Sequence, residues 1–207
     1  MKEHDEKLKK MEKFMEETLD EHGKSHLGVG WTSKEQQALM FDEFFYLLNK
    51  QKEPFSLNDL GCGLGDLYKW TQERSLPVSN YYGYDISARM VTEARKIYSD
   101  EVAIFEQAQA PTHTSDFSIA CGIFNTRLDE TEEAWAEYMR DMVITLKEKS
   151  RLGFAFNSLT SYVDWKEEHL FYADPLDWFD WCKRNVSRHV TLLHDSPLYV
   201  WTIVVRL

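Results

Sequence analysis

An acid-flanked loop with three alternating glycines, Asp59-Leu-Gly-Cys-Gly-Leu-Gly-Asp66, constrains the fold of this 207-residue chain most strongly. The apolar residues 55–60 before the loop are expected to form a strand, and residues 67–74 after it a helix. Glycines are needed at such a junction because the backbone turns tightly and lies against a ligand without Cβ atoms in the way. The loop therefore indicates a ligand site, with a glycine-rich turn that binds nothing as the alternative.

Strands and helices are expected to alternate along the rest of the chain. Further strands are expected at residues 80–85, 102–106, 117–124, 152–157, 189–193 and 199–206. Further helices are expected at residues 87–98, 130–147 and 175–185. This alternation predicts an α/β fold with a doubly wound, mostly parallel, seven-stranded sheet of the Rossmann-like type. Because a short turn joins the last two strands, they are expected to form a C-terminal antiparallel hairpin.

The first 53 residues have a different pattern from the rest. Residues 5–20 place apolar side chains at helical spacing, and residues 34–50 read as a second helix with Ser33 as its N-cap. Pro54 ends that helix. We therefore expect an N-terminal helical cap at 1–53 and an α/β domain at 54–207, with an insertion at about 158–174.

Charge and composition narrow the possible partners. Acidic residues outnumber Lys and Arg by 35 to 24, a net charge of −11, which disfavours nucleic-acid binding. No apolar run approaches the ~18–20 residues of a membrane-spanning helix, and the charged amino terminus does not resemble a secretory signal, so a cytoplasmic protein is expected. The three cysteines and seven histidines lack metal-ligand spacing, so no metal site is expected.

Two acids distinguish the loop from a dinucleotide-binding fingerprint. That fingerprint would need a third glycine at position 66, which holds Asp66. Asp85 ends the next expected strand, twenty residues after Gly65, where a carboxylate suits the two hydroxyls of a ribose. The alternative role for Asp85 is to cap the helix that follows.

At this point residues 54–207 resemble the class I S-adenosylmethionine-dependent methyltransferases, most specifically in LNDLGCGLGD and YYGYDISARMVTEAR. The resemblance implies S-adenosylmethionine as the cofactor and S-adenosylhomocysteine as the product. It also implies that the glycine loop holds the methionyl part, that Asp85 holds the ribose, and that the adenine lies after the third strand. The cofactor-binding residues that it implies are Asp59, Gly61, Cys62, Gly63, Gly65, Asp85, Ile86, Gln107, Ala108, Cys121, Gly122 and Ile123.

The acceptor is expected beyond the carboxyl ends of the strands, where ligands lie in open α/β sheets. Residues 158–174 leave the fifth strand there and are rich in aromatic side chains, and a long irregular stretch of this kind is usually functional. Gly30-Trp31-Thr32-Ser33, with Gln37 and Phe41, also resembles a cap found in small-molecule methyltransferases. The expected substrate-binding residues are Trp31, Asn125, Arg127, Trp165 and Tyr172. The alternative is that these aromatic residues only pack the cap onto the domain.

Methyl transfer to a hydroxyl or amine requires that its proton be removed, and histidine has a suitable pKa. His169 is the first candidate for this base, and His194 and Tyr162 are the others. The alternative for each histidine is a surface or packing role. Asn125 is followed by Thr-Arg instead of the Pro-Pro-aromatic run of base-methylating enzymes, which disfavours methylation of nucleic-acid bases.

The leading hypothesis is thus O- or N-methylation of a small metabolite. The alternatives are a methyltransferase that acts on a protein or RNA partner, and a non-catalytic binding subunit of the same fold. A nicotinamide-dependent dehydrogenase is disfavoured by Asp66 and by the closing hairpin.

Overall fold

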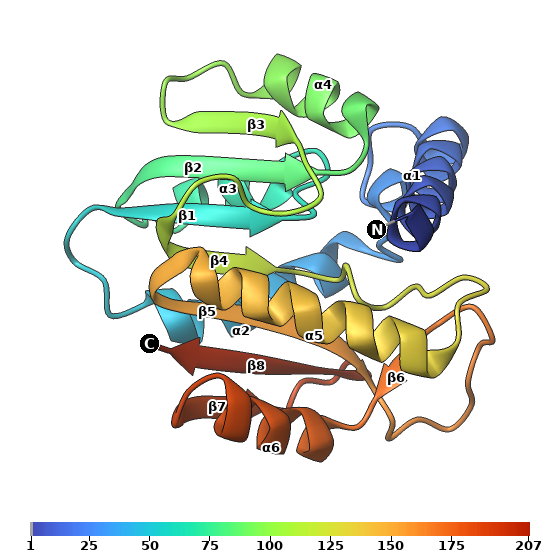
Figure 1. Cartoon of the computed structure of the whole chain (residues 1–207). Coiled ribbons are helices and arrows are strands. Elements are labelled where there is room, and N and C mark those ends of the chain that lie inside the picture. Colours follow the sequence, from blue (N-terminus) through green and yellow to red (C-terminus); the bar gives the residue numbers. More distant parts are fainter. Residues whose placement is uncertain (1) are drawn as a thin grey trace.

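A twisted sheet runs through the centre of the molecule, with helices on both faces (Figure 1). The computed structural model describes residues 2–207, with side chains from residue 7 onward. The strands are β1 (Phe55–Leu60), β2 (Val78–Asp85), β3 (Ala103–Gln107), β4 (Ser115–Ala120), β5 (Ser150–Thr160), β6 (Tyr172–Ala173), β7 (His189–Leu193) and β8 (Val200–Arg206). The helices are α1 (Lys2–His22), the short 3₁₀ helix η1 (Leu27–Val29), α2 (Lys34–Leu48), α3 (Asp66–Glu73), α4 (Ala88–Ile97), α5 (Glu132–Glu148) and α6 (Pro175–Asn185).

The strand order is β3-β2-β1-β4-β5-β8-β7, and β6 pairs with β5 outside this path. The strands β1 to β5 are parallel, whereas β8 is antiparallel to both β5 and β7. The predicted doubly wound sheet and its C-terminal hairpin are therefore confirmed. Within residues 2–207 the sheet has eight strands and not the expected seven, because residues 172–173 add a short strand beside β5.

The core lies in two layers, one on each face of the sheet. The helices α2, α3 and α4 pack on one face, against side chains such as Leu57, Phe117 and Val204. The helices α5 and α6 pack on the other face, where Phe156 and Trp201 are fully buried. Every residue of β1 is buried, as expected for a central parallel strand that is covered on both sides.

Two expected strand ends differ from the structure by more than two residues. The apolar run 117–124 was expected to be one strand, but β4 ends at Ala120 because the chain turns at Gly122, which has φ of +75°. Conversely, β5 extends to Thr160, three residues beyond the expected end, because its last residues pair with β8 and β6. In these places the apolar residues indicate that the segment is buried. They do not distinguish a strand from a turn, because both can be buried.

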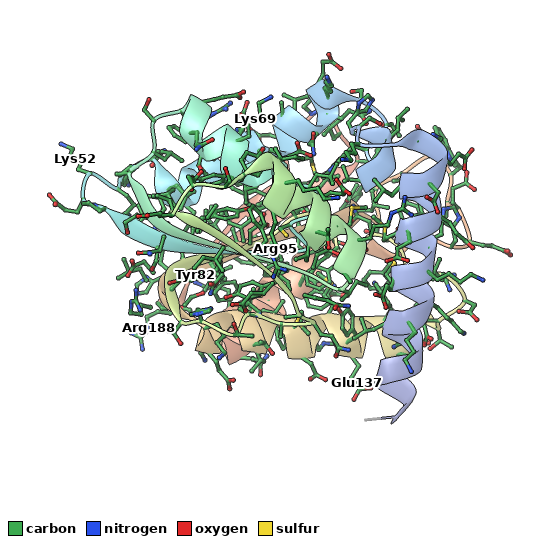
Figure 2. All side chains as sticks on the ribbon, turned by 90° about the horizontal axis from the view of Figure 1, so that it is seen from above. Lys52, Lys69, Tyr82, Arg95, Glu137 and Arg188 are labelled. Carbon is green, nitrogen blue, oxygen red and sulfur yellow. The ribbon has the colours of Figure 1, made fainter. Side chains whose placement is uncertain are left out.

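The two amino-terminal helices occupy different places. Ser33 is the N-cap of α2, as predicted, and accepts a hydrogen bond from the backbone N–H of Gln36 at 3.1 Å. The buried side chains Phe44 and Leu48 join α2 to the same core as the strands. In contrast, α1 lies across the carboxyl ends of the parallel strands and forms one side of the molecule in the view from above (Figures 1 and 2). No helix in residues 2–207 combines the length and apolarity needed to cross a bilayer.

Ion pairs fasten α1 to the rest of the molecule near its middle and near its carboxyl end. Lys10 pairs with Asp129 at 2.7 Å near the start of α5, and Asp20 pairs with Arg89 on α4 at 2.5 Å. The apolar stripe of α1 faces the sheet, and Leu8 is buried in the layer that includes α5. As a result, α1 closes over the space beyond the strand ends.

Candidate active site

A cavity of about 790 Å³ lies at the carboxyl ends of the strands, beneath α1. Its wall includes the glycine loop after β1, the ends of β2 and β4, and parts of the segment that connects β5 to β6. This is the position at which open α/β sheets bind their ligands. The described residues therefore bring the expected cofactor loop and the expected acceptor segment around one space.

The glycine loop has a backbone that other residues would not adopt. Gly61, Gly63 and Gly65 have φ of +78°, +51° and +84°. A Cβ atom on Gly61 would lie 2.1 Å from Cγ2 of Ile123, and one on Gly65 would lie 2.7 Å from the ring of Tyr98. Gly61 and Gly63 line the cavity, whereas Gly65 packs behind it and lets the loop enter α3. At these two glycines the loop presents main-chain atoms without side chains to the cavity. Such a surface fits the methionyl part of S-adenosylmethionine.

Asp85 lies at the end of β2 and faces the cavity. Its two carboxylate oxygens accept hydrogen bonds from the backbone N–H groups of Gly63 and Ser87, both at 2.9 Å. Burial raises the pKa of this carboxyl group above its ordinary value. The side chain of Ser87, and not that of Asp85, caps α4, because its hydroxyl accepts from the N–H of Met90 at 3.2 Å. The capping alternative for Asp85 is therefore replaced by a role in fixing the glycine loop beside the cavity.

Replacement of Asp85 by alanine should weaken the binding of S-adenosylhomocysteine by roughly tenfold or more, because a hydrogen bond to a charged group contributes about 1.5–3 kcal/mol. Calorimetric titration of wild type and variant measures this change, and thermal unfolding is its companion measurement. If the folded variant bound S-adenosylhomocysteine as tightly as wild type but unfolded at a much lower temperature, Asp85 would have only a structural role.

Asp59 is a buried member of the cavity wall. It lies on β1, is 2% exposed, and accepts a hydrogen bond from the hydroxyl of Tyr81. Burial raises the pKa of Asp59 from 3.8 to about 7, and the hydrogen bond from Tyr81 opposes that rise. The charged form is therefore costly in the folded protein, by up to about 4 kcal/mol. This cost is absent below the unfolded-state pKa, grows as the pH rises towards 7, and is complete above it.

Asp59→Asn should consequently raise the free energy of unfolding at about pH 8 and leave it nearly unchanged at about pH 4. The asparagine keeps an oxygen that accepts from Tyr81, so the comparison isolates the charge. Urea unfolding of both proteins at both pH values measures the difference. A gain of the same size at the two pH values would contradict the raised pKa.

The expected adenine end of the site is apolar, and one of its residues lies elsewhere than expected. Ile86 and Ala108 line the cavity. Gln107 lies outside this cavity, beside a smaller one of about 290 Å³, and its side-chain N–H donates to the carbonyl of Ile86 at 3.0 Å. Gln109, which sequence reasoning missed, lines the main cavity in its place. Gln107 therefore fixes the backbone of Ile86 and does not face the main cavity.

The turn after β4 brings Cys121, Gly122 and Ile123 to the cavity wall, as expected. The N–H of Gly122 donates to the side-chain oxygen of Asn157 at 2.7 Å, which fixes the turn. Gly122 has φ of +75°, and the ring of Trp31 lies 3.4 Å from the place that a Cβ atom would take, so the tryptophan packs against the turn. Burial raises the pKa of the thiols of Cys62 and Cys121, which both line the cavity, so the protonated form of each is favoured.

Four of the five expected substrate-binding residues line the cavity: Trp31, Asn125, Trp165 and Tyr172. Arg127 does not line it. Its guanidinium instead donates to the carbonyl of Leu170 at 3.2 Å and to that of Glu130. Arg127 therefore ties the turn after β4 to the segment before β6, because a guanidinium satisfies several carbonyls at once.

Of the three candidates for the base, only His169 lines the cavity. Its backbone carbonyl accepts hydrogen bonds from the N–H groups of Arg127 and Leu128, at 2.9 and 3.1 Å, which hold its main chain in place. His194 and Tyr162 lie outside the cavity, with their ring centroids 5.7 Å apart, and Tyr162 is 58% exposed.

Further residues of the wall were not singled out from the sequence as site residues. The amphipathic stripe of α1 contributes apolar side chains, and the turn between β7 and β8 contributes others. These residues are Leu8, Met11, Phe14, Met15, Pro197, Leu198 and Tyr199. The apolar stripe of α1 could be predicted from the sequence. That the turn between β7 and β8 lines the same cavity could not.

Comparisons with known proteins agree with this geometry. A family model described as a methyltransferase domain matches residues 58–145. Rv1506c of Mycobacterium tuberculosis, which its name assigns as a methyltransferase, is 42% identical over 157 residues, covering 74% of this chain and 94% of that protein.

Solved structures show the same fold at low identity. Magnesium protoporphyrin IX methyltransferase from Synechocystis PCC 6803, with bound S-adenosylhomocysteine, superposes with a TM-score of 0.61 at 14% identity, over 86% of this chain and 89% of that one. An S-adenosylmethionine-dependent methyltransferase from Leishmania major gives 0.65 at 12% identity, over 97% and 82%. With its glycine loop, the acid at the end of β2 and its closing hairpin, the chain belongs to the class I S-adenosylmethionine-dependent methyltransferases.

Proposed function

We propose that this methyltransferase methylates an oxygen or nitrogen atom of a small metabolite. The observation that carries the proposal is the larger cavity beneath α1, in which the expected cofactor loop and an aromatic wall face the same space. A volume of about 790 Å³ is in the range of ligand pockets and holds a cofactor together with a small acceptor. The segment 1–53 then acts as the cap of the α/β domain 54–207, and residues 158–174 form the acceptor wall.

The described residues fit S-adenosylmethionine, which supplies an electrophilic methyl group when bound. The bare backbone at Gly61 and Gly63 would hold its methionyl part, and the carboxylate of Asp85 would accept from the ribose hydroxyls. The apolar side chains of Ile86 and Ala108 would pack against the adenine.

The acceptor side would be organised by residues that orient the nucleophile and exclude water. Trp31 and Tyr172 lie in the cavity wall, where rigid aromatic faces restrict how an acceptor sits. His169 would take the proton that the acceptor hydroxyl or amine loses as the new bond to carbon forms. The proton would then pass from the imidazole to solvent, because His169 is exposed.

A protein or RNA acceptor is the alternative at the same site. The cavity wall beneath α1 carries no lysine or arginine among the described side chains that line it, which favours an acceptor that is not a polyanion. A non-catalytic role is disfavoured by the intact glycine loop and by the acid at the end of β2.

Incubation of the full chain with S-adenosylmethionine and a metabolite library, followed by mass spectrometry, tests the proposal. We expect a methylated library member and an equal amount of S-adenosylhomocysteine, both dependent on the protein. Transfer of label to protein or RNA extracts, with none to the library, would contradict a small-molecule acceptor.

A further inference from the structure

Carboxyl groups dominate the ionisable side chains of the cavity wall. Five carboxylic acids line the cavity, whereas no lysine or arginine is among the described residues that line it; these acids are Asp59, Asp66, Asp85, Asp164 and Glu167. Three of them belong to the cofactor half of the site, at β1, the glycine loop and β2. Asp164 and Glu167 lie in the segment 158–174, which is proposed to form the acceptor wall. These two acids would therefore face the acceptor and not the cofactor.

The lysine and arginine side chains of the described residues do not line the cavity, and some of them are engaged elsewhere. The ammonium of Lys7 is 3.3 Å from the carboxylate of Glu130. Lys166 places its ammonium 5.6 Å from the ring centroid of Tyr172 without lining the cavity itself. In the view from above, Lys52 and Arg188 lie on the side of the molecule opposite α1 (Figure 2). An anionic acceptor would therefore face carboxylates in this wall without a lining cation to balance it.

The acceptor end of the cavity also holds an aromatic corner beside one of these acids. The hydroxyl of Tyr199 donates to the carboxylate of Asp164 at 3.0 Å. The rings of Trp165 and Tyr199 meet edge to face, with centroids 6.3 Å apart and an angle of 72° between their planes. All three side chains line the cavity, and Trp165 is 64% exposed. The corner therefore offers open ring faces next to a negative charge.

A cation is the ligand group that such a corner suits best. Ammonium groups are attracted to the faces of tryptophan and tyrosine by the ring quadrupole, and to a carboxylate by its charge. Because the hydroxyl of Tyr199 is already bonded to Asp164, ring and carboxylate are held as one unit. A neutral acceptor would use the rings alone.

We propose that the acceptor carries a permanently or predominantly positive ammonium group, bound by Asp164, Trp165 and Tyr199. The inference rests on the proposed function, since it names the class of small molecule that the same site accepts. The ammonium is a recognition group at the outer end of the cavity, and the atom that receives the methyl group is a separate oxygen or nitrogen nearer to His169. A molecule of the same shape with a carboxylate in place of the ammonium group should bind less tightly, because the acids of the wall would repel it.

Binding of charged probes to the full chain tests this assignment without requiring the acceptor to be known. Benzyltrimethylammonium is a suitable probe because its nitrogen has no lone pair and cannot be methylated. Phenylmethanesulfonate has a similar size and the opposite charge. Both are titrated into protein saturated with S-adenosylhomocysteine, at low ionic strength, while the indole N–H signals are followed by nuclear magnetic resonance. We expect saturable binding of the cation, at least tenfold tighter than that of the sulfonate.

Three variants locate the effect. Asp164→Asn removes the charge but keeps an oxygen that accepts from Tyr199, and it should weaken binding of the cation by about tenfold. Trp165→Leu should weaken it by a similar factor, and its indole signal identifies the residue. Glu168→Gln is the matched control, because it removes an exposed acid of the same segment that does not line the cavity, and it should change the affinity less than twofold.

The outcomes separate the inference from the proposed function. Failure of the cation to bind, equal or tighter binding of the sulfonate, or equal effects of Asp164→Asn and Glu168→Gln would each overturn the cationic acceptor. If S-adenosylhomocysteine binds normally in those samples, the proposed function stands. If S-adenosylhomocysteine itself does not bind, the proposed function fails, whichever probe is preferred.

Discussion

Replacing His169 with glutamine is expected to lower methyl transfer by about 10²–10⁴-fold, the usual contribution of a positioned general base. The imidazole lies in the cavity wall, and hydrogen bonds from two neighbouring N–H groups hold its backbone carbonyl. Glutamine retains polarity and approximate length but takes up no proton near neutral pH. Affinity for S-adenosylhomocysteine should stay nearly constant, because His169 belongs to the acceptor segment. Turnover with a methylated library member and calorimetry of the product measure the two quantities.

His194→Gln is the matched control for this experiment. It removes a second histidine that lies outside the cavity, against Tyr162, so turnover should change less than threefold or so on the same reasoning. A loss below tenfold in His169→Gln would remove His169 from the proton transfer. A large loss in the control alone would transfer the role to His194.

Gly61→Ala should reduce the affinity for S-adenosylhomocysteine by at least about 100-fold, or about 2.7 kcal/mol. Gly61 has φ of +78°, a region that costs other residues about 1–2 kcal/mol, and its Cβ would overlap Cγ2 of Ile123 at 2.1 Å. The added methyl therefore displaces either the loop or the turn after β4, and both line the cofactor half of the cavity. Calorimetry, corrected for the folded fraction by circular dichroism, measures the loss.

Gly23→Ala is the control that separates the effect of steric overlap with Ile123 from the effect of a positive φ. Gly23 also has a positive φ, +66°, but a Cβ there would meet nothing within 4 Å. This control should lose about 1–2 kcal/mol of stability at most and retain its affinity for the ligand. If Gly61→Ala behaved in the same way as the control, the glycine loop would not hold the cofactor.

The sheet could be predicted from the sequence because its strands are buried on both faces and end at distinct turn residues. The range 55–60 agrees with β1, and 175–185 agrees with α6, which Asp174 caps as Pro175 begins it. The end of β4 could not be predicted, since Ile123 and Phe124 continue the apolar run after the backbone has turned at Gly122. Burial was correct there, but the backbone conformation was not encoded in the apolar pattern.

The residues of the site also fall into those that could be predicted from the sequence and those that could not. Local motifs located the residues that a strand end or a glycine loop positions, such as Asp85 and Gly61. Contacts between distant segments were not visible, so Arg127 was expected in the substrate site although it binds backbone carbonyls. The corner of Asp164 and Tyr199 depends on the pairing of β5 with β8, which brings residues 35 positions apart into contact.

Titration of the full chain with S-adenosylhomocysteine, in parallel with NAD, tests most directly that the glycine loop and Asp85 bind an adenosyl amino acid. The spacing of Gly61, Gly63 and Gly65, with Asp66 where a dinucleotide site needs glycine, predicts micromolar binding of S-adenosylhomocysteine, about 8 kcal/mol, and no measurable binding of NAD. Clear binding of NAD without binding of S-adenosylhomocysteine would contradict the account.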